Sequence, residues 1–169
     1  TSQRVVDVLL QALGLQSNGQ GTMNNFLFGN DRFGFYETIG GGAGAGPGWN
    51  GRSGCHVHMS NTAITDVEVL EERFPVRVLE FGIRRDSGGK GIWNGGDGLV
   101  REIEFLENTT VSLLTQRRDE QPRPNGTPGR NLLWRNGAWQ TLSGIETIQV
   151  GPGDRIRIET PGGGAWLQE

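Results

Sequence analysis

Two histidines lie one residue apart directly after the cysteine, and these are the residues of the sequence best suited to chemistry. Cys55, His56 and His58 are the only cysteine and the only histidines among 169 residues. On a β-strand, residues i and i+2 face the same side, so both imidazoles could bind one metal ion while Cys55 faces away. No third ligand stands at a diagnostic spacing, so hydrogen-bonded histidines that hold a loop are the favoured alternative.

Other polar side chains near this pair could contact a substrate or order the loop. Asp66 could complete a metal shell, and Asn61 could bond its own backbone or the amide or carboxylate of a ligand. Arg52, which precedes the cysteine, is a further candidate. The paired arginines at 84–85 and 117–118 could bind a carboxylate or a phosphate, although surface ion pairs are their commoner use.

A glycine-rich stretch precedes the histidines, with eight glycines between Gly40 and Gly54. Because glycine lacks a Cβ, such a stretch can form a tightly shaped loop or let backbones approach closely. It could form a nest of amide groups that binds an anion, or it could pack against a neighbouring element, which we favour. It does not match the phosphate-binding pattern G-x-x-x-x-G-K-[ST]. The candidate loop glycines are Gly40, Gly41, Gly42, Gly44 and Gly46.

The elements that must position these residues are mostly strands. Apolar residues at helical spacing predict an amphipathic helix over 3–13, whose stripe should pack against a sheet of this chain or a preceding segment. A capping box from Thr65 to Glu68 predicts a short helix that ends at Arg73. Alternation and turn residues predict strands over 25–29, 32–39, 76–84, 99–106, 109–115, 132–135, 138–141, 144–150 and 155–159.

These elements predict a mainly β fold, a β-rich α+β domain that spans residues 1–169. The strands would form a sandwich or barrel-like antiparallel sheets, with an N-terminal helix and one short internal helix. The net charge of −3 gives no electrostatic case for nucleic acid. No apolar run reaches the ~20 residues of a membrane span. A single cysteine fits a reducing compartment, so we expect a cytoplasmic protein.

Several motifs in a fixed order resemble the C-terminal portion of the hydantoinase B/oxoprolinase family. They include the Gly-Gly-Ala-Gly-Ala-Gly-Pro run at 41–47, His-x-His-Met-x-Asn-Thr at 56–62, Gly-Gly-Asp-Gly at 95–98 and the terminal Thr-Pro-Gly-Gly-Gly at 160–164. Within the family, the sequence is most similar to the ATP-dependent 5-oxoprolinases. The resemblance covers nearly the whole chain, from about residue 24 to residue 164.

The resemblance implies hydrolysis of the cyclic amide 5-oxo-L-proline to L-glutamate, driven by ATP. It also implies that ATP is handled by a hydantoinase A-like portion or subunit, and that a divalent metal is bound earlier in the B portion. This chain would then be a C-terminal fragment, inactive alone, whose partners are those portions in an oligomer. No catalytic residue of the family maps onto these positions.

Two alternatives stay open from the sequence. The chain could belong to an N-methylhydantoinase B-type enzyme or to a ketone carboxylase, since related members of the family open hydantoins or serve in ketone carboxylases. It could also be a purely structural or interface domain, with all the chemistry upstream.

Overall fold

The computed structural model describes residues 2–21, 23–58, 60–118 and 126–167. The helices are α1 (Ser2–Ala12) and α2 (Val67–Arg73). The strands are β1 (Asn24–Gly29), β2 (Gly34–Thr38), β3 (Val76–Arg84), β4 (Gly98–Phe105), β5 (Thr109–Thr115), β6 (Arg130–Arg135), β7 (Ala138–Leu142), β8 (Ile145–Val150) and β9 (Arg155–Glu159). Every predicted strand and both predicted helices are found.

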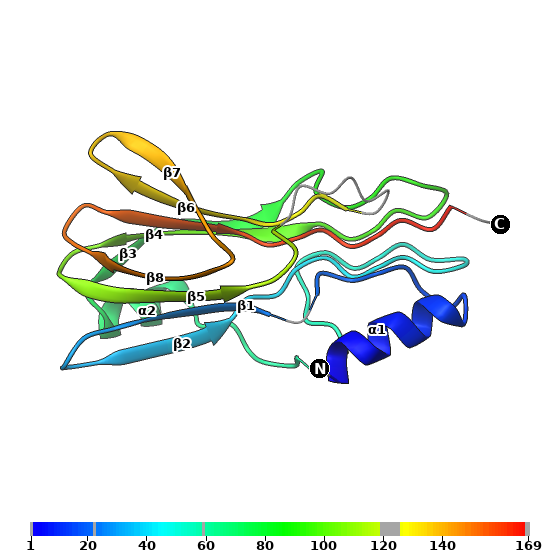
Figure 1. The fold of residues 1–169 in the computed structure, drawn as a ribbon, viewed down its shortest axis with the longest axis horizontal. Coiled ribbons are helices and arrows are strands. Elements are labelled where there is room, and N and C mark those ends of the chain that lie inside the picture. Colours follow the sequence, from blue (N-terminus) through cyan, green and yellow to red (C-terminus); the bar gives the residue numbers. More distant parts are fainter. Residues whose placement is uncertain (1, 22, 59, 119–125, 168–169) are drawn as a thin grey trace.

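The strands form two antiparallel sheets that face each other (Figure 1). One sheet has the order β2-β1-β5-β8, and the other has the order β3-β4-β9-β6-β7. The prediction of a mainly β fold with one N-terminal and one short internal helix is confirmed, and the sandwich is the form it takes.

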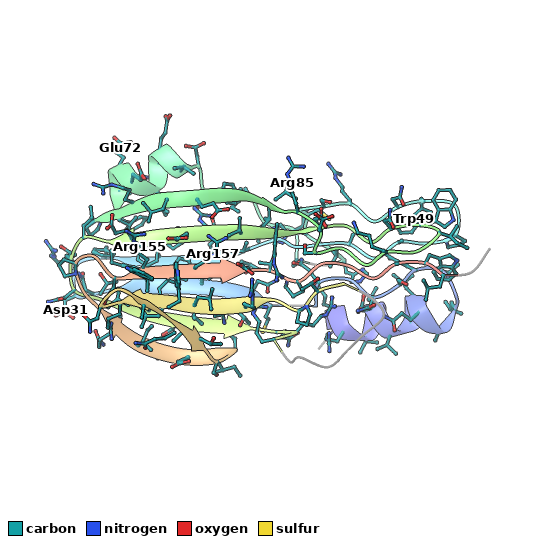
Figure 2. All side chains as sticks on the ribbon, turned by 90° about the horizontal axis from the view of Figure 1, so that it is seen from above. Asp31, Trp49, Glu72, Arg85, Arg155 and Arg157 are labelled. Atoms are coloured by element: carbon teal, nitrogen blue, oxygen red, sulfur yellow. The ribbon has the colours of Figure 1, made fainter. Side chains whose placement is uncertain are left out.

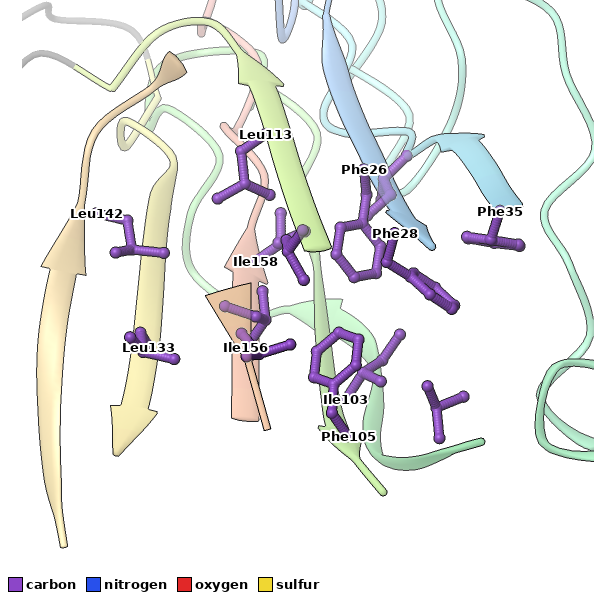
Figure 3. Close-up of a cluster of buried hydrophobic side chains, with 14 of the residues drawn as sticks. Phe26, Phe28, Phe35, Ile103, Phe105, Leu113, Leu133, Leu142, Ile156 and Ile158 are labelled. Atoms are coloured by element: carbon purple, nitrogen blue, oxygen red, sulfur yellow. The ribbon is translucent and has the colours of Figure 1, made fainter. Parts of the chain in front are cut away.

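The core lies between the sheets, because alternate residues of each strand point to one face. Phe26 and Phe28 of β1 face the side chains of β4 and β9, among them Ile103 and Ile156 (Figure 3). All four are at most 2% exposed. Each such side chain contributes about 1.5–3 kcal/mol when it is fully buried. The sandwich is therefore held together by the burial of apolar side chains between its two sheets.

The hairpin between β6 and β7 follows from two turn residues. Asn136 and Gly137 have φ values of +53° and +81°. A two-residue type I′ turn requires positive φ at both central positions, and Asn-Gly meets this requirement best. The predicted hairpin is confirmed.

Helix α1 turns its polar side toward the protein. Gln3 and Asp7 are buried, whereas Val5, Leu9 and Leu13 are each more than 50% exposed. The expectation that the apolar stripe packs against a sheet of this chain is wrong, because polar contacts attach the helix instead.

Helix α2 begins one residue later than its capping pattern suggested. Its N-cap is Asp66, whose Oδ1 accepts a hydrogen bond from the amide of Glu68 at 2.9 Å. The predicted cap at Thr65 is wrong because the Thr65 amide instead donates to Glu37 on β2, at 2.6 Å. Neither described helix is long and apolar enough to cross a membrane.

Candidate functional site

The glycine stretch belongs to a bundle of four extended segments, which we call the glycine bundle. The segments are 15–20, 40–54, 87–98 and 160–166. In Figure 1 they run side by side beyond the sheets, next to α1, and Figure 2 shows Trp49 at their far end. Residues 40–46 are all buried, although few of them have a side chain.

Backbones in the glycine bundle approach too closely for a side chain. A Cβ at Gly42 would lie 2.0 Å from the carbonyl oxygen of Gly96, and one at Gly44 would lie 1.9 Å from that of Ser17. Both distances are far below van der Waals contact, and the atoms that would clash belong to the backbone. Glycine is therefore required at these positions for the same steric reason as at the axis of collagen.

The other loop glycines shape the two ends of the stretch. Gly41 and Cys55 form an isolated antiparallel bridge, with N···O distances of 3.0 and 2.8 Å. A Cβ at Gly40 would lie 3.1 Å from the backbone of Cys55. Gly46 and Trp49 exchange two hydrogen bonds of 3.2 Å, and the Trp49 ring fills the space that a Cβ at Gly46 would need.

The middle of the stretch bonds to each of the other three segments. The carbonyl of Ala43 accepts from Gly96 at 2.9 Å, and the carbonyl of Ala45 accepts from Ser17 at 2.7 Å. The Ala45 amide donates to Gly164 at 2.8 Å. A strand in a sheet has at most two neighbours, so this is a three-dimensional bundle. The amides of Gly41, Gly42, Ala43, Ala45 and Gly46 all donate to backbone carbonyls and are not available to bind an anion.

His56 lies in a loop between two hydroxyl groups. Its Nε2 is 3.1 Å from Oγ1 of Thr62, and its Nδ1 is 3.4 Å from Oγ of Ser60. Burial lowers the pKa of His56 below its ordinary value, and the nearby Glu37 carboxylate offsets this only in part. A neutral imidazole held in this way can orient a polar group or exchange a proton through a hydroxyl.

His58 points to a different partner. Its Nε2 lies 3.2 Å from Oδ1 of Asp7 on α1, and the same oxygen accepts the Gly19 amide at 3.0 Å. His58 has a φ of +54°, which a strand does not allow. The two imidazoles therefore do not share a strand face as the spacing suggested, and His58 fastens α1 to the loop.

The remaining candidate residues make different contacts and do not form one site. Asp66 caps α2, as described above. The side chain of Arg52 is exposed, and its carbonyl accepts the Ala43 amide at 2.9 Å. Asn61 is exposed and makes no side-chain hydrogen bond within the described residues. In the part of the chain that the structure describes, no three His, Cys, Asp or Glu side chains form a group that could hold a metal ion.

Comparison with known proteins decides the family. The model of the family described as hydantoinase B/oxoprolinase matches residues 1–168. This chain belongs to the hydantoinase B/oxoprolinase family. The chain is 51% identical to 5-oxoprolinase 1 of Arabidopsis thaliana over 98% of its own length, and 49% identical to 5-oxoprolinase of Dictyostelium discoideum over 100%. It spans only 14% of the length of either relative.

A solved structure supports the fold of this hydantoinase B/oxoprolinase chain. The crystal structure of ATP-dependent caprolactamase from Pseudomonas jessenii superposes with a TM-score of 0.76 over 94% of this chain and 31% of that chain. The sequence identity is 24%, so this likeness concerns the fold.

One buried ion pair of this chain was not predicted from its sequence. Glu37 on β2 and Arg101 on β4 form an ion pair between the sheets, with side chains 3% and 0% exposed. Phe35 and Glu37 of β2 and Ile39, which directly follows that strand, occupy alternate positions, and all three are buried. A carboxylate at a position that the alternation places inside is the signal that could have revealed the pair.

Proposed function

We propose that this chain is the C-terminal part of an ATP-dependent 5-oxoprolinase-like enzyme, which opens the cyclic amide of 5-oxo-L-proline to L-glutamate. The observation that carries the proposal is the identity of about one half, over nearly the whole chain, to two proteins named 5-oxoprolinase. Residues 1–169 would act in it as one domain. Because the chain spans 14% of those relatives, the activity is that of a larger protein.

The reaction would explain why the enzyme contains the glycine bundle, a closely packed element with few side chains. An unstrained five-membered amide resists hydrolysis, and phosphorylation of its oxygen by ATP would make the carbon electrophilic. The site must then keep water from the activated intermediate until the correct step. The glycine bundle, with its backbones packed against each other, would form a wall of such a site or its interface with the rest of the enzyme.

His56 and His58 are the residues of this chain that we assign to polar contacts of the site, with Arg52, Asn61 and Asp66 beside them in the sequence. His56 is the stronger candidate for such a contact, because His58 already pairs with Asp7. ATP and a divalent metal would be bound by the hydantoinase A-like portion and by the earlier B portion. A cytoplasmic location and an oligomer remain predictions.

We further propose that the exposed apolar side of α1 packs against the preceding part of the B portion. Val5, Val8 and Leu9 of α1 and Leu13, which directly follows the helix, are each more than half exposed. This chain covers 31% of the caprolactamase chain, which leaves ample polypeptide to cover it. A purely structural role for this chain is the second candidate function, and it is favoured by the same unpartnered face and by the hydrogen-bonded amides of the glycine bundle.

The proposal is tested with the complete protein that contains this chain. It is incubated with ATP and either 5-oxo-L-proline or N-methylhydantoin, and both the opened product and ADP are measured. L-Glutamate formed in step with ADP supports the proposal. Turnover of N-methylhydantoin alone would assign the protein to the hydantoinase alternative. The isolated chain is expected to show no turnover with either compound.

A further inference from the structure

A pocket with a volume of ≈ 860 Å³ lies where the end of β3, the start of β6 and the end of β7 meet the glycine bundle. Sites for small molecules have volumes of about 300–1,000 Å³. Its lining includes the leucines Leu132 and Leu142 and the glycines Gly88 and Gly89. Its size and mixed lining suit a small organic molecule.

The lining of the pocket carries an excess of positive charge. Arg84, Lys90, Arg118 and Arg130 line it, and Asp86 is the one carboxylate among its described lining residues. Lys90 lies 3.3 Å from Asp86, whose side chain is 87% exposed. That exposed pair contributes little to neutralising the arginines.

Glu159 lies next to the pocket, and three arginines share its carboxylate. Its Oε2 lies 3.1 Å from Nε of Arg84 and 2.7 Å from Nη2 of Arg130. Its Oε1 accepts a hydrogen bond from Nε of Arg157 at 3.0 Å. With Asp86 and Glu159, two carboxylates face the four cations of the lining, so the described part of the site is positive.

Among the described residues, Arg118 is the cation of this lining that pairs with no carboxylate. Its guanidinium donates to Oδ1 of Asn24 at 2.8 Å and to Oδ1 of Asn131 at 3.2 and 3.3 Å, and it also donates to the carbonyl of Gln116. Within the described residues, these acceptors are all neutral. Burial, together with the charges of Arg84 and Arg117, lowers the pKa of Arg118 to about 9. Buried charges are usually paired, so this guanidinium would gain from an anion.

Each of the two arginines also has a donor left for a ligand. Nη2 of Arg118 donates once, to Asn131, so one of its two hydrogens has no acceptor among the described residues. Arg84 uses Nε and Nη1 for its hydrogen bonds and ion pair, so its Nη2 has no acceptor in the described part of the chain. Gly129 leaves Arg118 room, because a Cβ there would lie 2.6 Å from Cζ of Arg118. We propose that this pocket binds the carboxylate of a small acid, held by Arg84 and Arg118, with its carbon skeleton against Leu132.

A carboxylate has two oxygens, so one can accept from Nη2 of Arg84 and the other from Nη2 of Arg118, while Leu132 explains why a carbon skeleton is part of the ligand. 5-Oxo-L-proline has this chemistry, but its identity as the ligand rests on the proposed function. The carboxylate contact itself stands on the arginines alone.

Binding is measured by calorimetry on the complete protein without ATP. The probes are 5-oxo-L-proline and pyrrolidin-2-one, which is the same ring without the carboxylate. The R118Q variant is expected to bind 5-oxo-L-proline about tenfold more weakly or worse, as for the loss of a charged hydrogen bond, and to bind pyrrolidin-2-one unchanged. The matched control is R77Q, because Arg77 pairs with Glu104 outside the pocket and its side chain is 61% exposed.

Two further probes separate this site from the proposed function. Butyrate, a carboxylate without a lactam, should raise the melting temperature of the wild-type protein more than that of R118Q. If it does so while the protein fails to hydrolyse 5-oxo-L-proline, the site stands and the proposed function fails. Binding of inorganic phosphate that depends on Arg118, without binding of either acid, would overturn the carboxylate assignment.

Two other variants test the proposal if R118Q does not fold. R118K keeps the charge but loses the planar fork, and R84Q removes the other donor, so both should weaken the binding of either acid. If the folded variants bind the acids as tightly as R77Q does, the proposal is wrong.

Discussion

Arg101 on β4 donates a hydrogen bond from Nη1 to Oε2 of Glu37 on β2, across the interior of the sandwich. The pair also holds the chain before α2, because Nη2 of Arg101 donates to the Thr65 carbonyl at 3.3 Å and Glu37 accepts the Thr65 amide. One ion pair thus joins both sheets to the loop that follows the histidines.

Breaking this pair should cost much more than breaking a surface pair. Arg101→Met leaves Glu37 buried without its cation, and we expect a loss of about 3–5 kcal/mol in the free energy of unfolding. Arg77→Met, on the same sheet, should cost less than about 1 kcal/mol because its ion pair is exposed. Urea denaturation measures both. Equal losses in the two variants would show that the buried pair has no special role.

Alanine should not be tolerated in the middle of the glycine bundle. Gly42→Ala would place a Cβ 2.0 Å from a backbone oxygen, and we expect a loss of about 4 kcal/mol or more, or no folding. Gly82→Ala on β3 meets nothing within 4 Å and should change stability by less than about 1 kcal/mol. Thermal denaturation of the pair tests this. A Gly42→Ala variant as stable as Gly82→Ala would mean that the bundle is loosely packed.

Replacing His56 and His58 one at a time in the complete protein should have different effects. His58→Ala removes the contact with Asp7, so it should speed amide exchange in α1 and cost about 1–2 kcal/mol locally. His56→Ala should lower ATP-coupled turnover and leave exchange in α1 unchanged. If neither variant alters turnover or metal content, both histidines are structural.

Lowering the pH should destabilise the folded protein, because Glu159 then becomes protonated. Burial acts to raise the pKa of Glu159, but hydrogen bonds from Arg130 and Arg157 outweigh it and hold the pKa below its ordinary value. The stabilisation is therefore present above the unfolded pKa of about 4.3 and is lost as pH falls through the lower folded value. Glu159→Gln should flatten this acid limb of the stability curve. Glu72→Gln on α2 should leave it as in the wild type, and an equal effect of both would contradict the assignment.

The apolar side of α1 should matter only in the larger protein. Leu9 is 54% exposed here, so Leu9→Ser should change the stability of this chain alone by less than about 0.5 kcal/mol. In the complete protein the same change should cost about 2–5 kcal/mol, as for a buried leucine. Denaturation of both forms gives the comparison. No added cost in the complete protein would mean that nothing covers the helix.

Local patterns predicted the strands because alternation and turn chemistry act between neighbours in the sequence. The β6–β7 hairpin follows from Asn136 and Gly137 alone. The site depends on contacts between residues that are far apart in the sequence. Such contacts could not be predicted from local sequence patterns. His58 meets Asp7 across 51 positions, and Arg118 meets Asn24 across 94. The glycines were recognisable as a shaped element, but which backbones they touch was not.

The measurement that tests the central claim most directly is the formation of L-glutamate from 5-oxo-L-proline by the complete protein, with and without ATP. We predict that glutamate appears only when ATP is present, with ADP formed alongside it. Glutamate formed equally well without ATP, or no glutamate under either condition from a folded protein, would contradict the claim.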